Sequence, residues 1–580
     1  MIIGVIVVLV VLLDVLRLRS RASKLRVLAP GGGEHKLLNA TGVHPEGSWE
    51  TDADLVDLVP RDLPTVAALD LLGSVDPGKY RDDQWARGIS ASQAVLVRDE
   101  YAEEFDADDP TEFVAFVRRV KDHVKARVDI AVAPGLTAGP HDLGYRAATL
   151  RQLGKRPSLW IAGSVIGYAA VVAALVVDWR WGLVALAAYW AHPLLVFAGT
   201  PLWPRDLWVP RFVRTPYLWV KTAGGEKSAA EKRQAEHLKQ AWPWYEENRD
   251  RNFHEARRDT CPSCGSRDLR LWVTAHDLVQ RKPGTFTMDR CVRCGHVWQN
   301  PRLSEEGLGF YYRDFYDGLG ETSAEAVFSG KTEPYYGRAR MVEPFTTPAR
   351  WLDVGSGHAH FCLGAKEVLP QTRFDGLDQG AAIEEAARLG RIEQSYRGSF
   401  KDFAGELKGR YDVISMHHYL EHVRDPWEEL DIVADVLPDG GFLLIELPDP
   451  EWRLGKLFGQ YWMPWFQPQH QHMMPIGNLR DALADRGLTT VATERAEAHL
   501  CNDFTLALLL FLGNVAPRTP APWRPGRVRL RRTRSFLVWS LGIPAFFVAL
   551  GLDQTVNRFL ARRTGNGNAY RLLARKDTAS

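Results

Sequence analysis

The amino-acid sequence predicts an α/β domain in its second half, preceded by a small cysteine-rich module and by apolar helices. Three observations lead to this prediction: strand-like and helix-like segments alternate in the second half, two C-x-x-C pairs precede them, and long uncharged runs lie in the first half. A chain of 580 residues is too long for one hydrophobic core, so several folded units are expected. A formal net charge of +1 gives no global attraction to nucleic acid, which argues against a nucleic-acid partner.

The first segment, residues 1–16, has the features of a membrane anchor. It is apolar from Ile2 to Leu16 apart from Asp14, and it has neither a basic residue before the apolar run nor a small-residue cleavage site. It is therefore expected to be an uncleaved anchor. Basic residues follow it directly, and the excess of Lys and Arg on the cytoplasmic side of membranes places this end of the segment in the cytoplasm.

Two apolar runs, Leu159–Val177 and Gly182–Ala198, predict a transmembrane helical hairpin over residues 158–200. At about 1.5 Å per residue, each run is about long enough for a hydrocarbon layer of roughly 30 Å. The alternative is a buried helical pair in a soluble domain, but neither run has a polar face to turn toward water. Basic residues after the hairpin place both soluble parts in the cytoplasm, so a multi-pass membrane protein is predicted.

Residues 17–157 and 201–258 contain no recognisable chemical motif. The first region is predicted to be a cytoplasmic domain of unknown function with a helix over residues 111–127. The second is charged and helical in character, which is typical of an amphipathic connector.

Residues 259–302 have the pattern of a four-cysteine zinc ribbon. Two residues separate Cys261 from Cys264 and Cys291 from Cys294, so one tight turn can present each pair of thiolates to a tetrahedral ion. A glycine after each pair suits such a turn. Four thiolates fill the coordination sphere of Zn²⁺, so the ion would be structural. A redox dithiol and free thiols are the alternatives.

The segment Trp351–Phe361 predicts a buried strand that leads through the glycine loop Gly355-Ser356-Gly357 into a helix. The helix N-terminus would then present backbone amides to a ligand. Asp378 ends the next predicted strand about 20 residues later, where a carboxylate can accept hydrogen bonds from both ribose hydroxyls of a nucleoside. Together the two features predict a nucleoside-containing cofactor.

Two further segments continue the alternation of predicted strands and helices. A strand that opens into a loop and helix is expected over Arg410–Pro426, and a turn leads into a strand over Leu437–Leu447. This succession resembles the class I S-adenosylmethionine-dependent methyltransferases, and the segments Cys291–Gly295 and Asn300–Arg302 are similar to their bacterial subgroup with an N-terminal zinc ribbon. The resemblance covers about residues 259–505 and resumes at the end of the chain. It implies a Rossmann-like sheet with an antiparallel last strand over residues 303–580.

The resemblance also implies a set of cofactor-binding residues. The methionine side of S-adenosylmethionine would lie at Asp353 and the loop Gly355-Ser356-Gly357, the ribose at Asp378, and the adenine at Ser399 and Phe400, while His417 would face the cofactor. Two departures are visible: Ala359 replaces the third glycine of the loop, and Ser399 stands where many relatives have an acid. The loop lacks G-x-G-x-x-G, which argues against the alternative of a dinucleotide-binding oxidoreductase.

Several histidines are candidates for a general base, because an unperturbed imidazole titrates near neutral pH. We single out His418 and His470, together with His417, as the residues that would touch the substrate. His422 is expected to pack or hydrogen-bond within the helix that follows the fourth strand, and His472 is a further candidate.

The end of the chain is predicted to close the sheet with an antiparallel pair, Leu488–Glu494 and residues 568–576. The insertion between them, residues 503–560, contains apolar stretches around a basic one. Because the last strand must return to a cytoplasmic sheet, a single span is excluded and an interfacial or re-entrant element is expected. We therefore expect a membrane-associated methyltransferase that acts on a lipid, lipid-linked or other small-molecule acceptor. The alternatives are an RNA methyltransferase that binds RNA through the zinc ribbon and a non-catalytic membrane scaffold.

Overall fold

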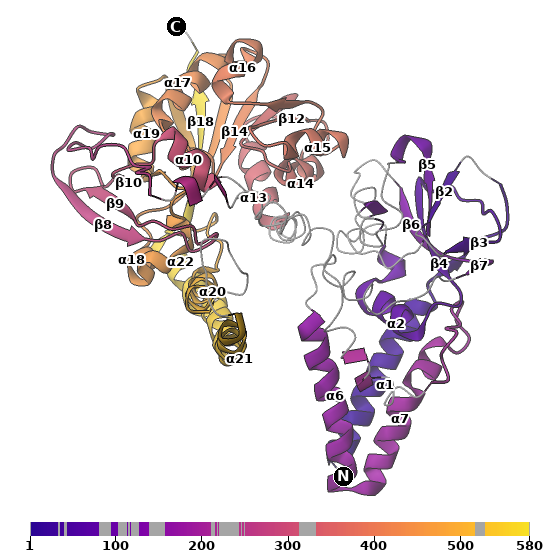
Figure 1. Cartoon of the computed structure of the whole chain (residues 1–580). Coiled ribbons are helices and arrows are strands. Elements are labelled where there is room, and N and C mark those ends of the chain that lie inside the picture. Colours follow the sequence, from indigo (N-terminus) through magenta and orange to yellow (C-terminus); the bar gives the residue numbers. More distant parts are fainter. Residues whose placement is uncertain are drawn as a thin grey trace. The chain divides into compact units, whose positions relative to one another are not determined.

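The chain divides into two compact units, Met1–Ala235 with Gly320–Ala326, and Glu236–Leu319 with Val327–Ser580 (Figure 1). The computed structural model describes residues 2–32, 35–39, 43–80, 94–102, 113, 116–117, 127–137, 157–209, 215–216, 218–219, 243–244, 246–248, 250–312, 332–516 and 528–578.

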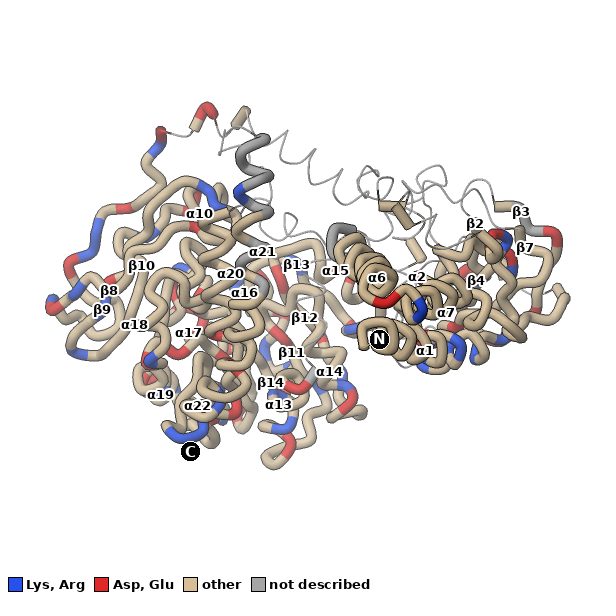
Figure 2. The backbone as a smooth tube through the Cα atoms, turned by 90° about the horizontal axis from the view of Figure 1, so that it is seen from below, with Lys and Arg blue, Asp and Glu red and all other residues tan. Residues whose placement is uncertain are grey.

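In the first unit, three apolar helices lie side by side: α1 (Ile2–Ala22), α6 (Pro157–Val177) and α7 (Trp179–Phe197). Figure 2 shows them end-on as neighbours. The predicted hairpin is confirmed as a helical pair. The close packing of α7 on α6 requires a glycine, because a Cβ at Gly182 would lie 2.3 Å from the Cα of Leu175.

The first helix is longer than the predicted anchor of residues 1–16. It continues to Ala22 because Leu18 and Ala22 are buried in the core that the helices share with the neighbouring sheet. Asp14 is a charged residue in an otherwise apolar run. Its Oδ2 lies 3.0 Å from Nε2 of the buried His192 on α7. The Arg19 guanidinium donates to the carbonyl of Leu195 at the end of α7, so the basic end of α1 and the end of α7 coincide.

By length and composition, one of the helices in the described part of the chain qualifies to cross a membrane, through the window Trp160–Val177 of α6. The expectation of a multi-pass protein is not supported by this criterion, since α1 and α7 do not meet it.

The rest of the first unit is built on a five-stranded sheet in the order β1-β6-β4-β5-β2. The strand β4 is buried along its whole length, and α2 (Thr65–Ser74) follows it. Most of the helix expected at 111–127 and most of the connector 201–258 lie outside the described residues. The strands are β1 (Arg26–Val27), β2 (His35–Asn39), β4 (Leu55–Pro60), β5 (Ala94–Arg98) and β6 (Val128–Ala133), with a separate pair β3 (His44–Pro45) and β7 (Leu136–Thr137) and the short helices η1 (Pro77–Lys79) and η2 (Asp99–Tyr101).

The second unit contains a seven-stranded sheet in the order β13-β12-β11-β14-β15-β18-β17 (Figure 1). The first five strands in this order are parallel, and β18 runs antiparallel between β15 and β17. The predicted closing pair is confirmed, because Leu488 pairs with Lys576 and Glu494 with Arg571. The strands are β11 (Arg350–Val354), β12 (Arg373–Asp378), β13 (Ser395–Arg397), β14 (Val413–His417), β15 (Phe442–Pro448), β17 (Leu488–Glu494) and β18 (Ala569–Lys576).

Helix α13 precedes the first of these strands, and further helices lie between the strands along the chain, as expected for an α/β fold. They are α13 (Thr332–Val342), α14 (His360–Val368), α15 (Ala382–Arg388), α16 (Phe400–Leu407), α17 (Pro426–Val436), α18 (Arg453–Phe458) and α19 (Ile476–Ala484), with the short helices η3 (Gly459–Tyr461) and η4 (Met463–Trp465); α10 (Glu305–Tyr312) precedes them.

The cysteine-rich module is not a separate sheet. Its strands β8 (Leu269–Ala275), β9 (Phe286–Cys291) and β10 (Val297–Gln299) are joined by β16 (His472–Met473), which the sequence places far downstream. The boundary predicted at residue 302 therefore separates parts that share one four-stranded sheet.

Between β17 and β18 the chain forms α20 (Asp503–Val515), α21 (Val528–Leu552), the π-helical turn η5 (Asp553–Asn557) and α22 (Arg558–Thr564). The helices α20 and α21 pack against each other. Buried carboxylates attach them: Asp553 accepts from the backbone amides of Phe504 and Thr505, and Asp503 accepts from two tryptophan side chains. The helical insertion thus extends a few residues beyond the predicted end at 560.

Candidate active site and metal centre

The glycine loop lies at the carboxyl end of β11, where the chain turns into α14. Gly355 and Gly357 have φ of 75° and 53°, and Gly355 donates its amide hydrogen to the carbonyl of Leu377 on β12. Ala359 also has a positive φ, 53°, a conformation that favours glycine. The replacement of the third glycine therefore keeps the left-handed turn at some cost in backbone strain.

Asp378 ends β12 beside this loop. Its Oδ2 accepts from the amide of Gly357 at 2.9 Å, and its Oδ1 accepts from the amide of Gly380 at 2.7 Å. Each carboxylate oxygen has a further lone pair, so Asp378 can still accept hydrogen bonds from a ligand. The structure thus brings Asp378 and the glycine loop together, as the sequence predicted.

Asp353, which precedes the loop, is buried inside the domain. Its Oδ1 accepts from the hydroxyl of Ser415 at 2.6 Å. Burial raises the pKa of its carboxyl to about 6, although the Ser415 hydrogen bond opposes the shift. Ser356 lies in the loop with its hydroxyl 4.0 Å from the sulfur of Cys362.

The residues expected at the adenine serve local structure. Ser399 is the N-cap of α16, where its hydroxyl and the Asp402 side chain form a reciprocal capping box. The side chain of Phe400 is fully buried in the hydrophobic core. Any adenine contact of this segment would therefore come from its backbone or from the Ser399–Asp402 pair.

The side chain of His417, the last residue of β14, is only 6% exposed and lies against Phe361, with ring centroids 4.4 Å apart. Its Nε2 lies 3.8 Å from Oδ1 of Asp353. Burial and the nearby Arg338 guanidinium hold the pKa of His417 well below its usual value. The imidazole is therefore neutral at neutral pH, and neither ring nitrogen has a hydrogen-bond partner within the described ranges of the chain.

His418 has the opposite charge state. It adopts φ of 53°, with Nδ1 3.0 Å from Glu421 and Nε2 3.1 Å from Glu446. Burial by itself would lower the pKa of His418, but the hydrogen bonds to the two carboxylates raise it to about 9. The ring is therefore an imidazolium at neutral pH and does not have the free lone pair that a general base requires.

A buried network of charges surrounds Glu446 on β15, which the sequence reasoning overlooked. Arg338 of α13 and Arg571 of β18 both donate to its carboxylate, in addition to His418. Burial would raise the pKa of Glu446, but the two guanidinium groups hold it well below its usual value. The available signal was a lone acid in the apolar run of Phe442–Leu447.

His422 and His470 meet in a second cluster, next to Glu421. His422 lies in the loop before α17 and not in a helix, contrary to expectation, with Nδ1 2.7 Å from the hydroxyl of Tyr312. The His470 ring lies 4.5 Å from that of His422, and its Nδ1 is 2.7 Å from the carbonyl of Pro464. Burial lowers the pKa of His470 to about 3. The remaining candidate, His472, is on β16, and its ring is not part of this cluster, because its Nδ1 lies 3.1 Å from Nε2 of His296.

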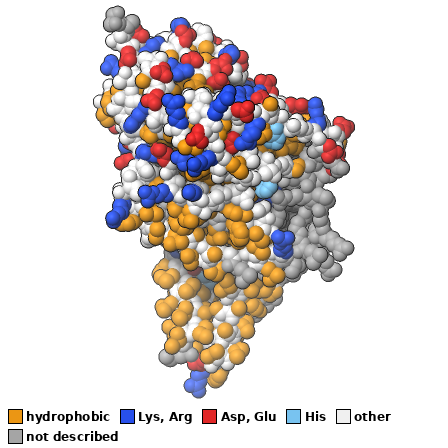
Figure 3. Space-filling model, turned by 90° about the vertical axis from the view of Figure 1, so that its left-hand side faces the viewer, with side chains coloured by type: hydrophobic (Ala, Val, Ile, Leu, Met, Phe, Trp, Pro, Cys, Tyr) orange, Lys and Arg blue, Asp and Glu red, His pale blue; other side chains and the backbone are white. Residues whose placement is uncertain are grey.

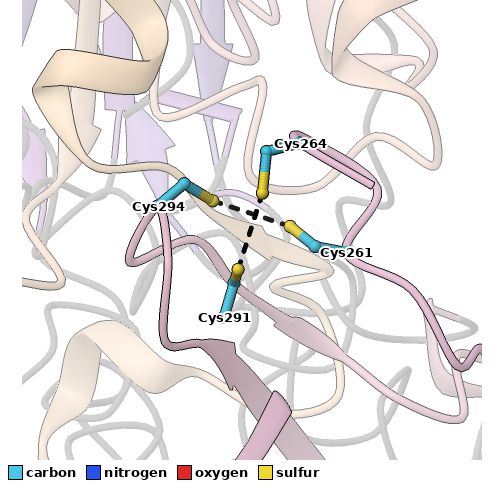
Figure 4. A group of neighbouring side chains, drawn as sticks. All are labelled: Cys261, Cys264, Cys291 and Cys294. Atoms are coloured by element: carbon cyan, nitrogen blue, oxygen red, sulfur yellow. Dashed lines mark hydrogen bonds between the residues drawn. The ribbon is translucent and has the colours of Figure 1, made fainter. Parts of the chain in front are cut away.

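The four cysteines converge as the sequence predicted (Figure 4). The sulfur atoms of Cys261 and Cys294, and those of Cys264 and Cys291, are 3.6 Å apart. A tetrahedral Zn²⁺ with bonds of about 2.3 Å needs sulfur atoms about 3.8 Å apart, so the arrangement fits this ion.

Comparisons with known proteins agree with this site. Residues 335–493 match a family model described as a methyltransferase domain. Ubiquinone biosynthesis O-methyltransferase from Vibrio parahaemolyticus is 35% identical over 96 residues, which are 16% of this chain and 40% of that protein. The enzyme of the same name from Xanthomonas campestris is 32% identical over 115 residues, 19% of this chain and 46% of that protein. The chain thus spans less than half the length of these curated relatives.

Among solved structures, a SAM dependent methyltransferase from Archaeoglobus fulgidus is similar to 44% of this chain and 98% of its own, with 17% identity and a TM-score of 0.28. The family match, the glycine loop with Asp378 and the topology of the sheet lead to one conclusion. Residues 335–493 form a methyltransferase domain of the class I, S-adenosylmethionine-dependent type.

Proposed function

We propose that this chain transfers the methyl group of S-adenosylmethionine to a lipid or lipid-linked acceptor at a membrane. The observation that carries the proposal is the assembly of the glycine loop, Asp378 and a cluster of buried polar side chains where the parallel strands β11, β12 and β14 end. In open α/β sheets, ligands bind outside the carboxyl ends of the strands, so cofactor and acceptor would meet there.

The cofactor would be held mainly by the loop and Asp378, with the charged carboxylate accepting from the ribose hydroxyls. Tyr419 packs on the loop, because a Cβ at Gly355 would lie 2.6 Å from its ring. Glu421 and His422 follow it in the same loop, and we propose that they lie on the acceptor side of the cofactor. Methyl transfer needs the acceptor and the methyl carbon to be aligned, so positioning can supply most of the acceleration.

Membrane association is supported by the outer surface of the bundle of α1, α6 and α7. Figure 3 shows hydrophobic side chains gathered on this bundle. Large apolar residues are exposed on each helix, among them Leu13 at 66%, Ile166 at 70% and Leu183 at 50%. The polar pair Asp14–His192 lies between the helices, as polar groups in membrane-spanning bundles do. We propose that the bundle enters the bilayer as one body, with its basic end in the cytoplasm.

The insertion between β17 and β18 supports an acceptor that comes from the bilayer. Phe547 and Val548 of α21 are 64% and 63% exposed, and Phe559 of α22 is 58% exposed. Such an apolar surface is unusual on a soluble domain, and it suits insertion into the interfacial layer of a membrane.

For the four cysteines we propose a structural Zn²⁺. Four thiolates leave no open coordination position, so the ion would stabilise the ribbon and take no part in methyl transfer.

The test is to incubate the purified full chain with S-adenosylmethionine labelled in its methyl group and with separated lipid, small-molecule and RNA fractions. We expect the label in the lipid fraction and its absence with the Asp378→Ala variant. Label in RNA alone would contradict the acceptor class, and no label in any fraction would contradict the activity.

A further inference from the structure

The side chains of Glu421, His422 and His470 form a compact cluster at the proposed acceptor position. One ligand atom from each lies within 4.8 Å of the others. Two backbone hydrogen bonds join the segments that carry them, since the amides of Gln471 and His472 both donate to the carbonyl of Glu421. The main chain itself therefore fixes the approach of the three residues.

Hydrogen bonds at the second ring nitrogen place the proton of His470 and allow the same placement in His422. The partner of His470 Nδ1 is the carbonyl of Pro464, which can only accept, so Nδ1 carries the hydrogen and Nε2 has the lone pair. The hydroxyl of Tyr312 lies 2.7 Å from Nδ1 of His422 and 3.3 Å from the carbonyl of Gln469, so it can donate to the carbonyl in the tautomer in which Nδ1 of His422 donates to the hydroxyl. Nε2 of His470, and Nε2 of His422 in that tautomer, then carry lone pairs that can bind a metal ion. Metal-bound histidines are commonly oriented in this way by their second nitrogen.

The carboxylate of Glu421 likewise has one oxygen held by a hydrogen bond and one that is available to a ligand. Its Oε1 is held by Nδ1 of His418. Its Oε2 is buried and has no hydrogen-bond partner among the residues whose positions the structure gives. A buried carboxylate oxygen without a partner is costly unless a cation or a donor occupies the space beside it.

From this geometry we infer that Glu421, His422 and His470 bind a divalent transition-metal ion. Two neutral imidazoles and one carboxylate are a donor set that Zn²⁺ and Fe²⁺ both accept, and three protein ligands leave a coordination position open. Bonds of about 2.0 to 2.2 Å place tetrahedral ligand atoms about 3.4 Å apart, so small side-chain movements would close the cluster around the ion.

The open position gives the ion a role that rests on the proposed function. It would bind a hydroxyl oxygen of the acceptor and favour its deprotonated form. Methyl transfer to this oxygen breaks the bond between the methyl carbon and the sulfonium sulfur, forms a carbon–oxygen bond and releases the hydroxyl proton to solvent. The acceptor class is thereby narrowed to a hydroxyl compound.

The test uses Co²⁺, because thiolate ligands produce an intense sulfur-to-metal absorption that nitrogen and oxygen ligands do not. The full chain, depleted of metal and titrated with Co²⁺, should bind about two ions, one with and one without this absorption. His470→Gln and the near-isosteric Glu421→Gln should each remove the ion without the sulfur absorption and keep the other. The control His499→Gln changes another buried histidine, one that accepts a hydrogen bond from the amide of Asn568 outside the cluster, and should bind both ions.

A single bound ion with sulfur absorption in the wild type would overturn the inference, and so would an unchanged titration of both variants. The binding measurement needs no acceptor, so it can succeed even if the proposed methyl transfer fails. If transfer occurs at the same rate with and without the second ion, the role of the ion in transfer is overturned.

Discussion

At the scale of single residues, long-range contacts determine which candidate groups can perform which chemistry. His417 and His418 are adjacent in the sequence, yet one is a neutral imidazole beside Asp353 and the other an imidazolium between two glutamates. His418 is therefore suited to hold Glu421 and Glu446 in place. The histidines near the proposed acceptor position that can offer a nitrogen lone pair to a ligand are instead His422 and His470.

Asp378 provides the most direct test of the cofactor site. Replacing it with alanine removes charge-assisted hydrogen bonds to the ribose, each worth about 1.5 to 3 kcal/mol, so affinity for S-adenosylmethionine should fall at least about tenfold. Titration calorimetry measures this change. Glu384→Ala, which removes an exposed carboxylate on the following helix, should leave affinity unchanged. Equal affinity of wild type and Asp378→Ala would contradict the ribose assignment.

Asp353 should make stability depend on pH. Its carboxyl has a pKa of about 6 in the folded protein and a usual value of 3.8, so the folded state binds more protons between these values. Stability therefore falls as pH rises through this range and stays lower above it, by up to about 3 kcal/mol. Asp353→Asn has no such group, so its melting temperature relative to wild type should increase from about pH 4 to about pH 7. A difference that is independent of pH would show that the carboxyl is ionised when folded.

At the scale of elements, the ribbon and the methyltransferase domain are joined by a strand. Val297 of β10 pairs with Met473 of β16, only three residues after His470. Because β16 belongs to both parts, local destabilisation of the ribbon should also destabilise the acceptor region.

Cys264→Ser tests this connection. It should lower the content of tightly bound zinc, and amide hydrogen exchange should become faster in β8 to β10 and also in β16. Cys501→Ser changes a cysteine outside the cluster and should keep both the zinc and the protection. Full zinc content in Cys264→Ser, or protection unchanged in β16, would contradict the prediction.

The close packing of α6 on α7 leads to a second prediction about the elements of the fold. Gly182→Leu would force the backbones at Leu175 and Gly182 apart and should destabilise the bundle by about 1 to 3 kcal/mol or more. Gly163→Leu is the matched control, because a Cβ at Gly163 meets no atom of the described chain within 4 Å. Thermal unfolding in detergent should show a lower melting temperature for the first variant only; equal values would argue against the close approach.

At the scale of the whole molecule, apolar surface occurs in both units, on the helical bundle of the first and on the insertion of the second. Attachment of the chain to a membrane requires only one of these two apolar surfaces. The surface of α21, close in sequence to the last strand of the catalytic sheet, is therefore proposed to serve access of the acceptor.

Replacing Phe547 and Val548 together with serine should test this role. Each replacement would remove about 1.5 to 3 kcal/mol of the free energy gained by burying an apolar side chain in the membrane. Turnover of an acceptor in vesicles should therefore fall about tenfold or more. The protein should stay in the membrane fraction, and turnover of a detergent-dispersed acceptor should change little. Leu271→Ser, at an exposed position on the ribbon, is the control. Equal rates on both forms of the acceptor would show that the insertion has only a structural role.

Several features of this chain could be predicted from local spacing and periodicity alone. These are the apolar helical pair, the paired cysteines, the glycine loop with Asp378, and the two closing strands. Other features are visible only in the folded chain: β16 completes the ribbon, His192 pairs with Asp14, Glu446 joins two arginines, and Glu421, His422 and His470 converge. The reason is physical: burial and charged partners fix the protonation and orientation of a side chain, and the fold brings those partners from distant parts of the chain.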